Sequence, residues 1–553
     1  MAAMTETFDY IVVGGGAAGC VAAARLVAEG GARVLLLEAG HSHRHPLLDM
    51  PPGIFKMING SRFMRYHQTV PQAHLGGRVH DIPQGHVLGG GTSVNAQVYM
   101  RGRPADYDAW HARLCGDNDD PGWRWADVLP HFRAMEGNDR LFDARHGADG
   151  PLLVSDPGHV NEVSRWFVQS AQALGLPYTH DFNGPAQRGV GFYQFMNRHG
   201  RRSSAAYAFL APLERDPRLT VRLNAPVQRI EIEGGRAVGV AYRDASGAER
   251  RAHAEAEVVL AAGALVTPQL LMLSGIGPAD QLRAHGIPCL ADLPGVGENL
   301  VDHPEVPIVA TTHGRHGYHK QGVGWRMLRN GLQFRLFGSG PILSAGVEAG
   351  AFVNPADPGA EPTIQAFCVP IVYLDRDTLG LVEDTYGLTV TTVVVKPRSR
   401  GHVRLRSADP AAMPLVSPNL LHDPADAREM VAAQRFFLRA FQERPLADHV
   451  RRVAIPDPAD LGDDALLAHC RRFVKTNYHP SGTARMGAAG DGLAVLDPRL
   501  RVRGIERLRV CDLSAMPDIT AGNTTAPAMM LGSRCAELVL GGSSAVSGQR
   551  YPL

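Results

Sequence analysis

Residues 8–40 hold the pattern that most constrains the fold of this chain. Residues 8–13 are a short apolar run rich in β-branched side chains, typical of a strand buried on both faces. Small residues follow in the spacing G-x-G-x-x-G and open a helix expected over 17–29: Gly14, Gly16, Ala17, Ala18 and Gly19. A second apolar run over residues 33–37 ends at Glu38. This order of strand, glycine turn, helix, strand and acid predicts a Rossmann-like dinucleotide-binding unit.

Each part of this pattern has a physical role. The first glycine makes the tight turn, the second lets a pyrophosphate approach, and the third lets helix and strand touch. The phosphates would sit on the helix N-terminus, which favours anions. Glu38 would accept hydrogen bonds from an adenosine ribose, and its charge would repel the 2′-phosphate of NADP. The pattern therefore indicates FAD or NAD.

Length and composition restrict the class of protein. A chain of 553 residues predicts two or more domains, and 44% apolar with 20% charged residues is typical of a soluble globular protein. The formal net charge is +1 without a long run of one sign, so neither nucleic acid nor an anionic membrane is an evident partner. No apolar run approaches the roughly 20 residues of a membrane span.

Cysteines and histidines indicate neither disulfides nor a metal site. The seven cysteines are scattered singly without a C-x-x-C spacing, which fits a reducing compartment. His41, His43 and His45 form a cluster that we interpret as a solvated loop, because no Cys or carboxylate spacing supports a metal. The first strand begins within ten residues and leaves no room for a signal segment. We expect a cytoplasmic protein.

A second glycine-rich segment spans residues 85–95. Three consecutive glycines and then small hydroxyl residues would let backbone amides approach a ligand closely. The alternative is a flexible surface turn. Val87, Leu88 and Val94 are apolar and would anchor the segment to a core, which favours the ligand.

Five further motifs follow the N-terminal unit in order. They are GGGTSVN at 89–95, GALVTPQLLMLSGIG at 263–277, GVGENLVDH at 295–303, YHPSGT at 478–483, and DLSAMP at 512–517 followed by GNT at 522–524. Together they resemble the glucose-methanol-choline family of FAD-dependent alcohol oxidoreductases along nearly the whole chain. The resemblance and the motifs imply bound FAD with further contacts from Gly89, Gly90, Asn95, Gln97, Val98, Val227, Ala262, Tyr478, Asp512, Asn523 and Thr524.

The resemblance also implies the domain plan. We expect an α/β fold, α+β overall, with an antiparallel-sheet substrate domain inserted into the Rossmann-like FAD-binding domain. The motifs stop over 311–475, where alternating strands such as 388–396 and a helix near 426–443 suggest a separate sheet. The expected limits are 1–155, 192–310 and 476–540 for the FAD-binding domain, 156–191 and 311–475 for the substrate domain, and 541–553 for a C-terminal tail. Alternating segments at 227–233 and 236–242 predict a hairpin, 508–511 a strand and 527–540 a helix.

Oxidation of an alcohol requires a base near the hydroxyl and a hydride acceptor beside the carbon. His479 stands in a loop restricted by proline and glycine, and its position matches the family's catalytic histidine. Without that match, a single histidine in a large core is more often structural. The resemblance makes Asn523 its partner: the amide N–H could hold the alkoxide, and the residue could also cap the following helix. That helix could direct its positive N-terminus at reduced flavin.

Three positions depart from the family pattern. His86 and Gln84 stand where the family commonly has a basic residue and often an arginine, so contacts near the phosphates would differ. Val94 stands where members with covalently bound flavin have a histidine, which predicts non-covalent FAD.

Together these observations predict FAD-dependent oxidation of a primary alcohol to an aldehyde. His479 would abstract the proton, a hydride would pass to flavin N5, and oxygen or a quinone or other carrier would be the final acceptor. A flavin-dependent lyase or photodecarboxylase on the same scaffold is the alternative. Substrate choice is expected to lie in 311–475, for example at Phe352 or Phe367. Neither the substrate nor the oligomeric state follows from these motifs.

Overall fold

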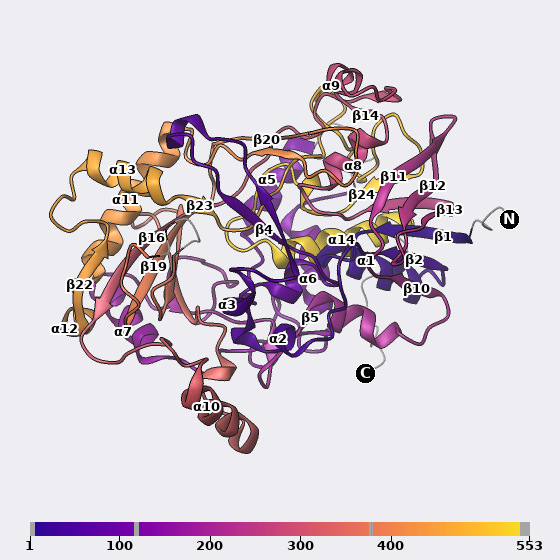
Figure 1. Ribbon diagram of the computed structural model, residues 1–553. Helices are drawn as coiled ribbons and strands as arrows, with labels where there is room; N and C mark the ends of the chain where they lie inside the picture. Colours follow the sequence, from indigo (N-terminus) through magenta and orange to yellow (C-terminus); the bar gives the residue numbers. More distant parts are fainter. Residues whose placement is uncertain (1–5, 115–120, 375–377, 379, 542–553) are drawn as a thin grey trace.

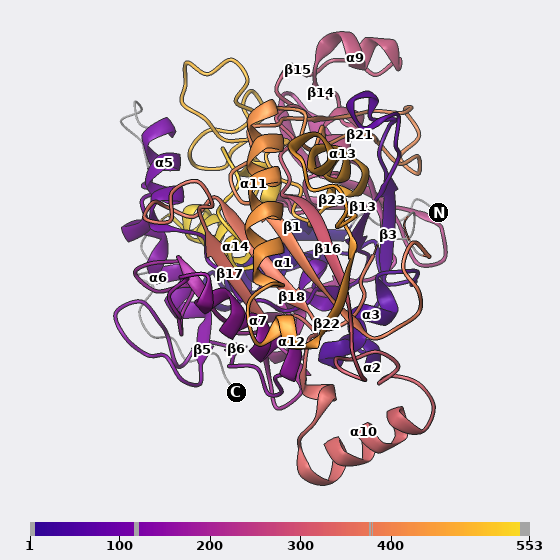
Figure 2. The same ribbon diagram turned by 90° about the vertical axis from the view of Figure 1, so that its left-hand side faces the viewer.

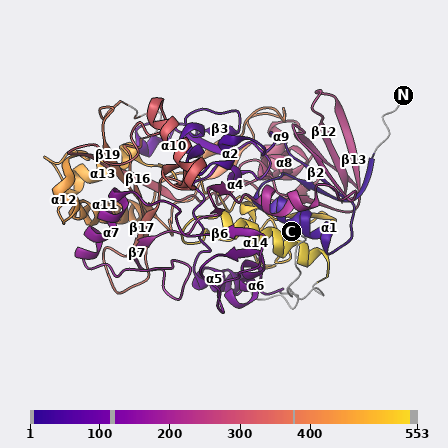
Figure 3. The same cartoon turned by 90° about the horizontal axis from the view of Figure 1, so that it is seen from below.

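Two large sheets organise the chain. The structure, a computed structural model, describes residues 6–114, 121–374, 378 and 380–541. The sheets lie at opposite ends of the molecule, as Figure 1 and Figure 3 show from two directions. Of the expected tail at 541–553, only Gly541 lies within the described residues. The predicted α/β class, α+β overall, is confirmed.

The first sheet carries the dinucleotide pattern. Its parallel part runs in the order β10 (Leu219–Arg222), β2 (Val34–Leu37), β1 (Glu6–Val13), β13 (Glu249–Leu260), with β24 (Leu508–Val510) beside the end of β13. An antiparallel extension adds β12 (Arg236–Arg243) and β11 (Val227–Glu233), which form the predicted hairpin. The strands predicted over 8–13, 33–37 and 508–511 are confirmed as β1, β2 and β24.

Two helices pack closely beside this sheet and against each other (Figure 1). They are α1 (Ala17–Ala28) and α14 (Thr525–Val539). A Cβ on Gly19 would lie 2.0 Å from the carbonyl oxygen of Gly14, and a Cβ on Gly532 would lie 2.2 Å from that of Ala18. Glycine at these two positions therefore permits the close approach of α1 to its own turn and of α14 to α1.

The second sheet is antiparallel. Its order is β22 (Val450–Ile455), β16 (Pro304–Thr312), β19 (Gly387–Val394), β18 (Ile364–Val369), β17 (Ala349–Val353), β7 (Gly189–Phe192), with β23 (Lys475–Thr476) also on β16. The predicted limit at residue 310 falls inside β16, because the chain enters this sheet directly after the motif that ends at residue 303. The division into domains otherwise stays a prediction.

Helices cover one face of the second sheet and leave the other to a cavity. α7 (Glu162–Ala173), α11 (Pro424–Ala440) and α13 (Asp463–Phe473) lie across the covered face (Figure 2). Along β18, Ala366 and Cys368 pack under these helices, whereas Phe367 and Val369 line the cavity. Alternate residues of a strand point to opposite faces, so β18 contributes to both the core and the cavity wall.

Shorter elements complete the fold. A hairpin of β3 (Met64–Gln68) and β4 (Asp81–Gly85) precedes the second glycine-rich segment, which contains α4 (Gly91–Val94). Further helices are α2 (Pro46–Asp49), α3 (Ile54–Met57), α5 (Pro104–Leu114), α6 (Trp125–Met135), α8 (Thr267–Leu273), α9 (Ala279–Ala284), α10 (Gly324–Phe337) and α12 (Leu446–His449). Short strand pairs join β5 (Glu136–Asn138) to β6 (Leu152–Val154), β8 (Asn197–Arg198) to β9 (Arg201–Arg202), β14 (Ile276–Gly277) to β15 (Ala291–Asp292), and β20 (His402–Arg404) to β21 (Leu415–Ser417). Among the described helices, none combines the length and apolar character needed to cross a bilayer.

Candidate active site

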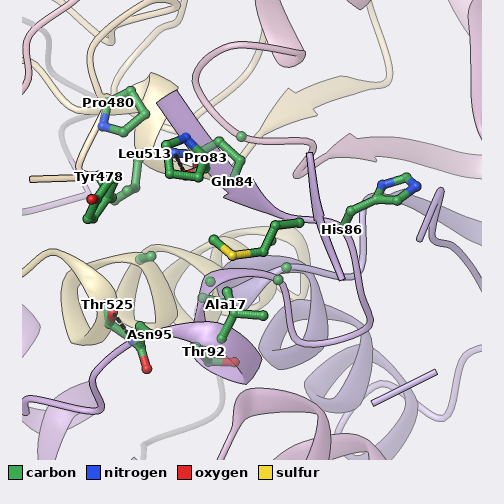
Figure 4. A pocket seen from close by; sticks show the side chains of 18 of the residues that line it. Ala17, Pro83, Gln84, His86, Thr92, Asn95, Tyr478, Pro480, Leu513 and Thr525 are labelled. Atoms are coloured by element: carbon green, nitrogen blue, oxygen red, sulfur yellow. Dashed lines mark hydrogen bonds between the residues drawn. The ribbon is translucent and has the colours of Figure 1, made fainter. Parts of the chain in front are cut away.

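A cavity of about 400 Å³ lies between the two sheets, within the size range of small-ligand sites. Most residues that the sequence predicts for the site line it: Gly14, Gly16, Ala17, Ala18, Glu38, Gly90, Asn95, Gln97, Val98, Val227, Ala262, Tyr478, His479, Asp512, Asn523 and Thr524. Figure 4 shows side chains from β4, α4, α14 and the loop at 478–480 around one space. The fold therefore brings residues from both ends of the chain to a single site.

Gly19 and Gly89 do not line the cavity but hold its wall together. The backbone N–H of Gly89 donates to the carbonyl of Gly15 over 2.6 Å. Gly90, at φ 53°, lies so close to Gly16 that a Cβ would be 2.8 Å from the Gly16 Cα. Gly19 permits the approach of α1 described above. The two glycine-rich segments are thus pressed against each other at one end of the cavity.

The N-terminus of α1 opens into this end. Gly16 precedes the helix, and no side chain caps it. Because Gly14, Gly16 and Ala17 line the cavity, the first N–H groups and the positive end of the helix dipole face it. This arrangement fits a pyrophosphate.

Glu38 lies beside the glycine turn with its carboxylate buried. One oxygen accepts a hydrogen bond from the backbone N–H of Gly15 over 2.8 Å, and the other accepts from that of Gly40 over 2.7 Å. Burial raises the pKa of this carboxyl to about 7, although both N–H groups act against the shift. Each oxygen has a further lone pair. With Val227 on the same cavity, the site fits the ribose and base of an adenosine.

β3 supplies a cation that the sequence pattern did not indicate. Arg65 lies directly opposite Gln84 in the β3–β4 hairpin, and both line the cavity together with His86. Directly opposite residues of an antiparallel pair point to the same face. Burial lowers the pKa of His86, so its imidazole is neutral at pH 7. Arg65 therefore provides, from the neighbouring strand, the positive charge that positions 84 and 86 lack.

Asn95 connects the second glycine-rich segment to α14. Its Nδ2 donates to Thr525 Oγ1 over 3.1 Å, the dashed contact in Figure 4. Its Oδ1 accepts from Nη1 of the buried Arg202 over 2.8 Å, and the same nitrogen donates to the carbonyl of Thr92 over 3.1 Å. Arg202, a residue outside the family motifs, thus positions this segment from behind.

Asp512 lies at the carboxyl end of β24, as the sequence predicts. Its carboxylate accepts from the N–H of Gly263 and the hydroxyl of Thr267, over 2.9 and 2.6 Å. It also accepts from the N–H and the hydroxyl of Ser514, over 2.8 and 2.6 Å. These four donors occupy the acceptor positions of the carboxylate. The side chain therefore positions loops, and contact with a cofactor would fall to its main chain.

His479 lines the cavity on the side of the second sheet, where its ring contacts His303 just before β16. Burial, and then the neighbouring His303, lower the pKa of its imidazole well below the usual 6.5. One oxygen of Asp302 accepts from the backbone N–H of His479 over 3.0 Å, and the other accepts from the hydroxyl of Thr476. The imidazole is therefore neutral at pH 7, in a loop fixed by a buried carboxyl.

A chain of hydrogen bonds through His303 fixes the tautomer of His479. His303 Nε2 lies 3.0 Å from the carbonyl oxygen of Val395, which can only accept, so this nitrogen carries a proton. A neutral His303 must then accept at Nδ1, which lies 3.0 Å from Nδ1 of His479. Burial lowers the pKa of His303 to about 3, so it is neutral. His479 therefore carries its proton on Nδ1 and a lone pair on Nε2.

A second chain of hydrogen bonds ends at Asn523, whose amide nitrogen faces Nε2 of His479. Tyr193 donates its hydroxyl proton to the carbonyl of Ala366 over 2.9 Å and accepts from Gln365 Nε2 over 3.2 Å. Gln365 Nε2 also donates to Oδ1 of Asn523 over 3.2 Å. The amide nitrogen of Asn523 consequently faces His479 Nε2, at 3.5 Å. Both chains make His479 Nε2 a proton acceptor, and Asn523 offers an N–H donor beside it.

Two buried amide nitrogens on the cavity wall have no hydrogen-bond partner among the described residues. They are Nε2 of Gln97 and Nδ2 of Asn477. A buried donor left without an acceptor costs about 1–3 kcal/mol, which a bound ligand with acceptor atoms would recover. A flavin ring carries such acceptors. With the helix N-terminus and Glu38 at the other end, the residues of this cavity fit FAD.

A buried ion pair stands beside His479. Lys475 Nζ lies 3.6 Å from a carboxylate oxygen of Glu305, and both side chains are at most 5% exposed. The ammonium also donates to the hydroxyls of Tyr373 and Tyr478, over 3.3 and 3.2 Å. Glu305 and the two tyrosines line the cavity. The wall at this point is polar but its carboxylate is neutralised, a feature that no motif indicates.

Comparisons with known proteins agree with this geometry. The GMC oxidoreductase family matches residues 8–305 and 397–532. The alcohol dehydrogenase (acceptor) of Pseudomonas putida is 39% identical over 539 residues, which cover 96% of this chain and 96% of that protein. The mitochondrial choline dehydrogenase of Homo sapiens is 36% identical over 544 residues, which cover 97% of this chain and 90% of that protein.

Solved structures show the same fold. Pyridoxine 4-oxidase from Mesorbium loti superposes with a TM-score of 0.86 at 30% identity, covering 96% of this chain and 98% of that one. A formate oxidase variant from Aspergillus oryzae RIB40 superposes with a TM-score of 0.87 at 26% identity, covering 98% and 99%. Since the family matches well over half of the chain and its motifs meet around one cavity, the chain belongs to the GMC oxidoreductase family.

Proposed function

We propose that this GMC oxidoreductase uses FAD to oxidise a primary alcohol to an aldehyde, with His479 as the base. The observation that carries the proposal is the lone pair on His479 Nε2, fixed by hydrogen-bond chains that end at the carbonyls of Val395 and Ala366. The names of the relatives, alcohol dehydrogenase and choline dehydrogenase, support an alcohol as the substrate. FAD, when bound, supplies the hydride acceptor at flavin N5.

Two residues of the protein act on the substrate hydroxyl: His479 accepts its proton and Asn523 stabilises its oxygen. The substrate hydroxyl donates its proton to His479 Nε2, while Asn523 Nδ2 donates a hydrogen bond to the oxygen as it becomes an alkoxide. The carbon then loses a hydride. The alcohol has thereby lost one proton and one hydride and becomes an aldehyde. Thr524 and Thr525 at the start of α14 line the same cavity. The positive end of that helix favours negative charge on a ligand in the cavity.

The final electron acceptor is oxygen, or a quinone or other carrier. The relatives include an alcohol dehydrogenase named for an acceptor and oxygen-dependent choline dehydrogenases from Brucella. Val94, buried in α4, has no nucleophilic atom, which supports non-covalent FAD. Denaturation should then release all flavin from the precipitated chain.

Anaerobic reduction of the flavin by a panel of alcohols in the dark tests this function. A lyase or photodecarboxylase would leave the flavin oxidised. His479→Ala should slow the reduction by about 10²–10⁴-fold, the usual contribution of a positioned base. Asn523→Ala should be milder, by roughly 1.5–3 kcal/mol for one hydrogen bond to a charged group.

FAD content provides the control, because the expected phosphate and ribose contacts lie at the other end of the cavity. Reduction of His479→Ala at the wild-type rate, with full FAD content, would place the base elsewhere.

A further inference from the structure

α10 carries its apolar face on the outside of the molecule. Trp325, Leu328, Leu332 and Leu336 are 77%, 61%, 58% and 61% exposed. Their spacing of three, four and four residues places them on one face of the helix. Figure 1 and Figure 2 show α10 projecting from the body of the protein. An ordinary surface helix turns such a stripe inward, so this orientation requires an explanation.

The opposite face of α10 is attached to the protein. The buried Asn330 donates from Nδ2 to the backbone carbonyl of Gln321 over 3.1 Å. Arg326 donates to the hydroxyl of Tyr386 over 2.6 Å. The ring of Phe334 lies against Gly200, where a Cβ would be 2.7 Å from it. These contacts fix the rotation of α10 about its own axis. The apolar stripe on the opposite face therefore points toward solvent.

The charges around the stripe are positive. Arg329 and Arg335 are exposed and flank the stripe on its two sides. From residue 306 to residue 347 the sequence has no Asp or Glu, but it has Arg315, Arg326, Arg329 and Arg335; Lys320 also lies there but pairs with Asp384. The net charge of +1 for the whole chain hides this local excess.

We propose that α10 docks the protein on the surface of an anionic lipid bilayer. A helix of 14 residues is about 21 Å long and can lie in the interface, with its apolar stripe among the acyl chains and its arginines at the phosphates. Tryptophan prefers this depth, and Trp325 is the most exposed residue of the stripe. A second copy fits less well, because a two-fold contact would bring the arginines of one stripe against those of the other.

The chain segment that follows α10 lines the active-site cavity. After α10 the chain passes through a short 3-10 turn, Pro341–Leu343, to Ala345 and Val347, which line the cavity. The ring of Phe55, also on the cavity wall, lies against Gly346. The helix is thus joined to the cavity wall by a short segment of chain. A role for the bilayer in delivering substrate or electron acceptor rests on the proposed function, whereas the docking does not.

Flotation of the full-length holoenzyme with vesicles tests the docking. Vesicles of phosphatidylcholine with phosphatidylglycerol should carry the protein upward, and vesicles of phosphatidylcholine alone should carry less. Leu328→Glu/Leu332→Glu should reduce flotation about tenfold or more, since it places two charges in the buried stripe. Arg329→Gln/Arg335→Gln should remove most of the preference for the anionic vesicles.

The matched control is Leu290→Glu/Leu493→Glu, at leucines 53% and 49% exposed elsewhere on the surface, which should float like the wild type. FAD content and melting temperature should be unchanged in all variants. Wild-type protein that stays at the bottom with both vesicles, or a stripe variant that floats equally, overturns the proposal. A concentration-dependent dimer that the stripe variant abolishes, without flotation, would assign the stripe to a second copy instead.

Discussion

The imidazoles of His303 and His479 share a hydrogen bond of 3.0 Å between their Nδ1 atoms. Because His303 Nε2 donates to the carbonyl of Val395, the shared proton belongs to His479. His303 is thus a positioning residue: it leaves the lone pair of His479 on Nε2, the nitrogen that faces Asn523.

His303→Phe should slow anaerobic flavin reduction about 10- to 100-fold, because His479 loses the acceptor that fixes its tautomer. His303→Asn, whose Oδ1 can occupy the position of Nδ1, should recover a large part of the rate. Stopped-flow absorbance measures both. A purely structural role would instead lower FAD content or melting temperature equally in the two variants, without rescue by asparagine.

The rate of flavin reduction should stay level as the pH falls past 6.5. Burial and His303 lower the pKa of His479 well below 6.5, so the imidazole remains an unprotonated base there and is lost only at lower pH. Rates from about pH 9 to about pH 5 with a saturating alcohol check this. A wild-type acid limb centred above 6.5 would contradict the assignment.

Glu38→Gln should weaken FAD binding by about 1.5–3 kcal/mol, the usual size of a hydrogen bond to a charged group. The glutamine amide nitrogen would face one of the backbone N–H groups of Gly15 and Gly40, so a donor would meet a donor. Titration of the apoprotein with FAD measures the loss. Glu255→Gln, at an exposed position of β13, is the matched control. Equal affinity of Glu38→Gln and wild type would place the ribose elsewhere.

Lys475→Met should shift substrate preference toward alcohols that carry a quaternary ammonium group. The change removes the ammonium 3.6 Å from Glu305 and leaves a carboxylate on the cavity wall beside His479. The variant makes this part of the wall one charge more negative, which favours a cationic substrate over a neutral one. The ratio of kcat/KM for a cationic and a neutral alcohol should change by about tenfold or more, or 1.4 kcal/mol.

Lys475→Met/Glu305→Gln separates this charge effect from a change of shape. The double variant has no carboxylate at position 305, so it should lose the gain for cationic alcohols. If it keeps that gain, the preference does not come from Glu305.

The cofactor end of the site follows from local sequence. The glycine turn, α1, β2 and Glu38 are neighbours along the chain, so the periodicity of about 30 residues already specifies their geometry. The resemblance of their motifs to those of the family predicts His479 and Asn523. The structure places both on one cavity, and their chemical roles stay predictions.

Other features depend on contacts between distant segments. His303 meets His479 across 176 positions of sequence, and Gln365 meets Asn523 across 158. Arg65 lies opposite Gln84 on the cavity wall only because β3 and β4 pair in that register. The apolar stripe of α10 has the same helical period whether it faces solvent or the core, so the sequence does not show which way it points. The overall net charge of +1 does not reveal the arginines around it. Sequence by itself determined the dinucleotide unit, because local spacing sets it, and it predicts His479 and Asn523 as reacting side chains only through the family resemblance. Only the tertiary structure decided which proton His479 carries, where the cations lie and which face of a helix meets water, because these depend on packing between segments that local patterns do not relate.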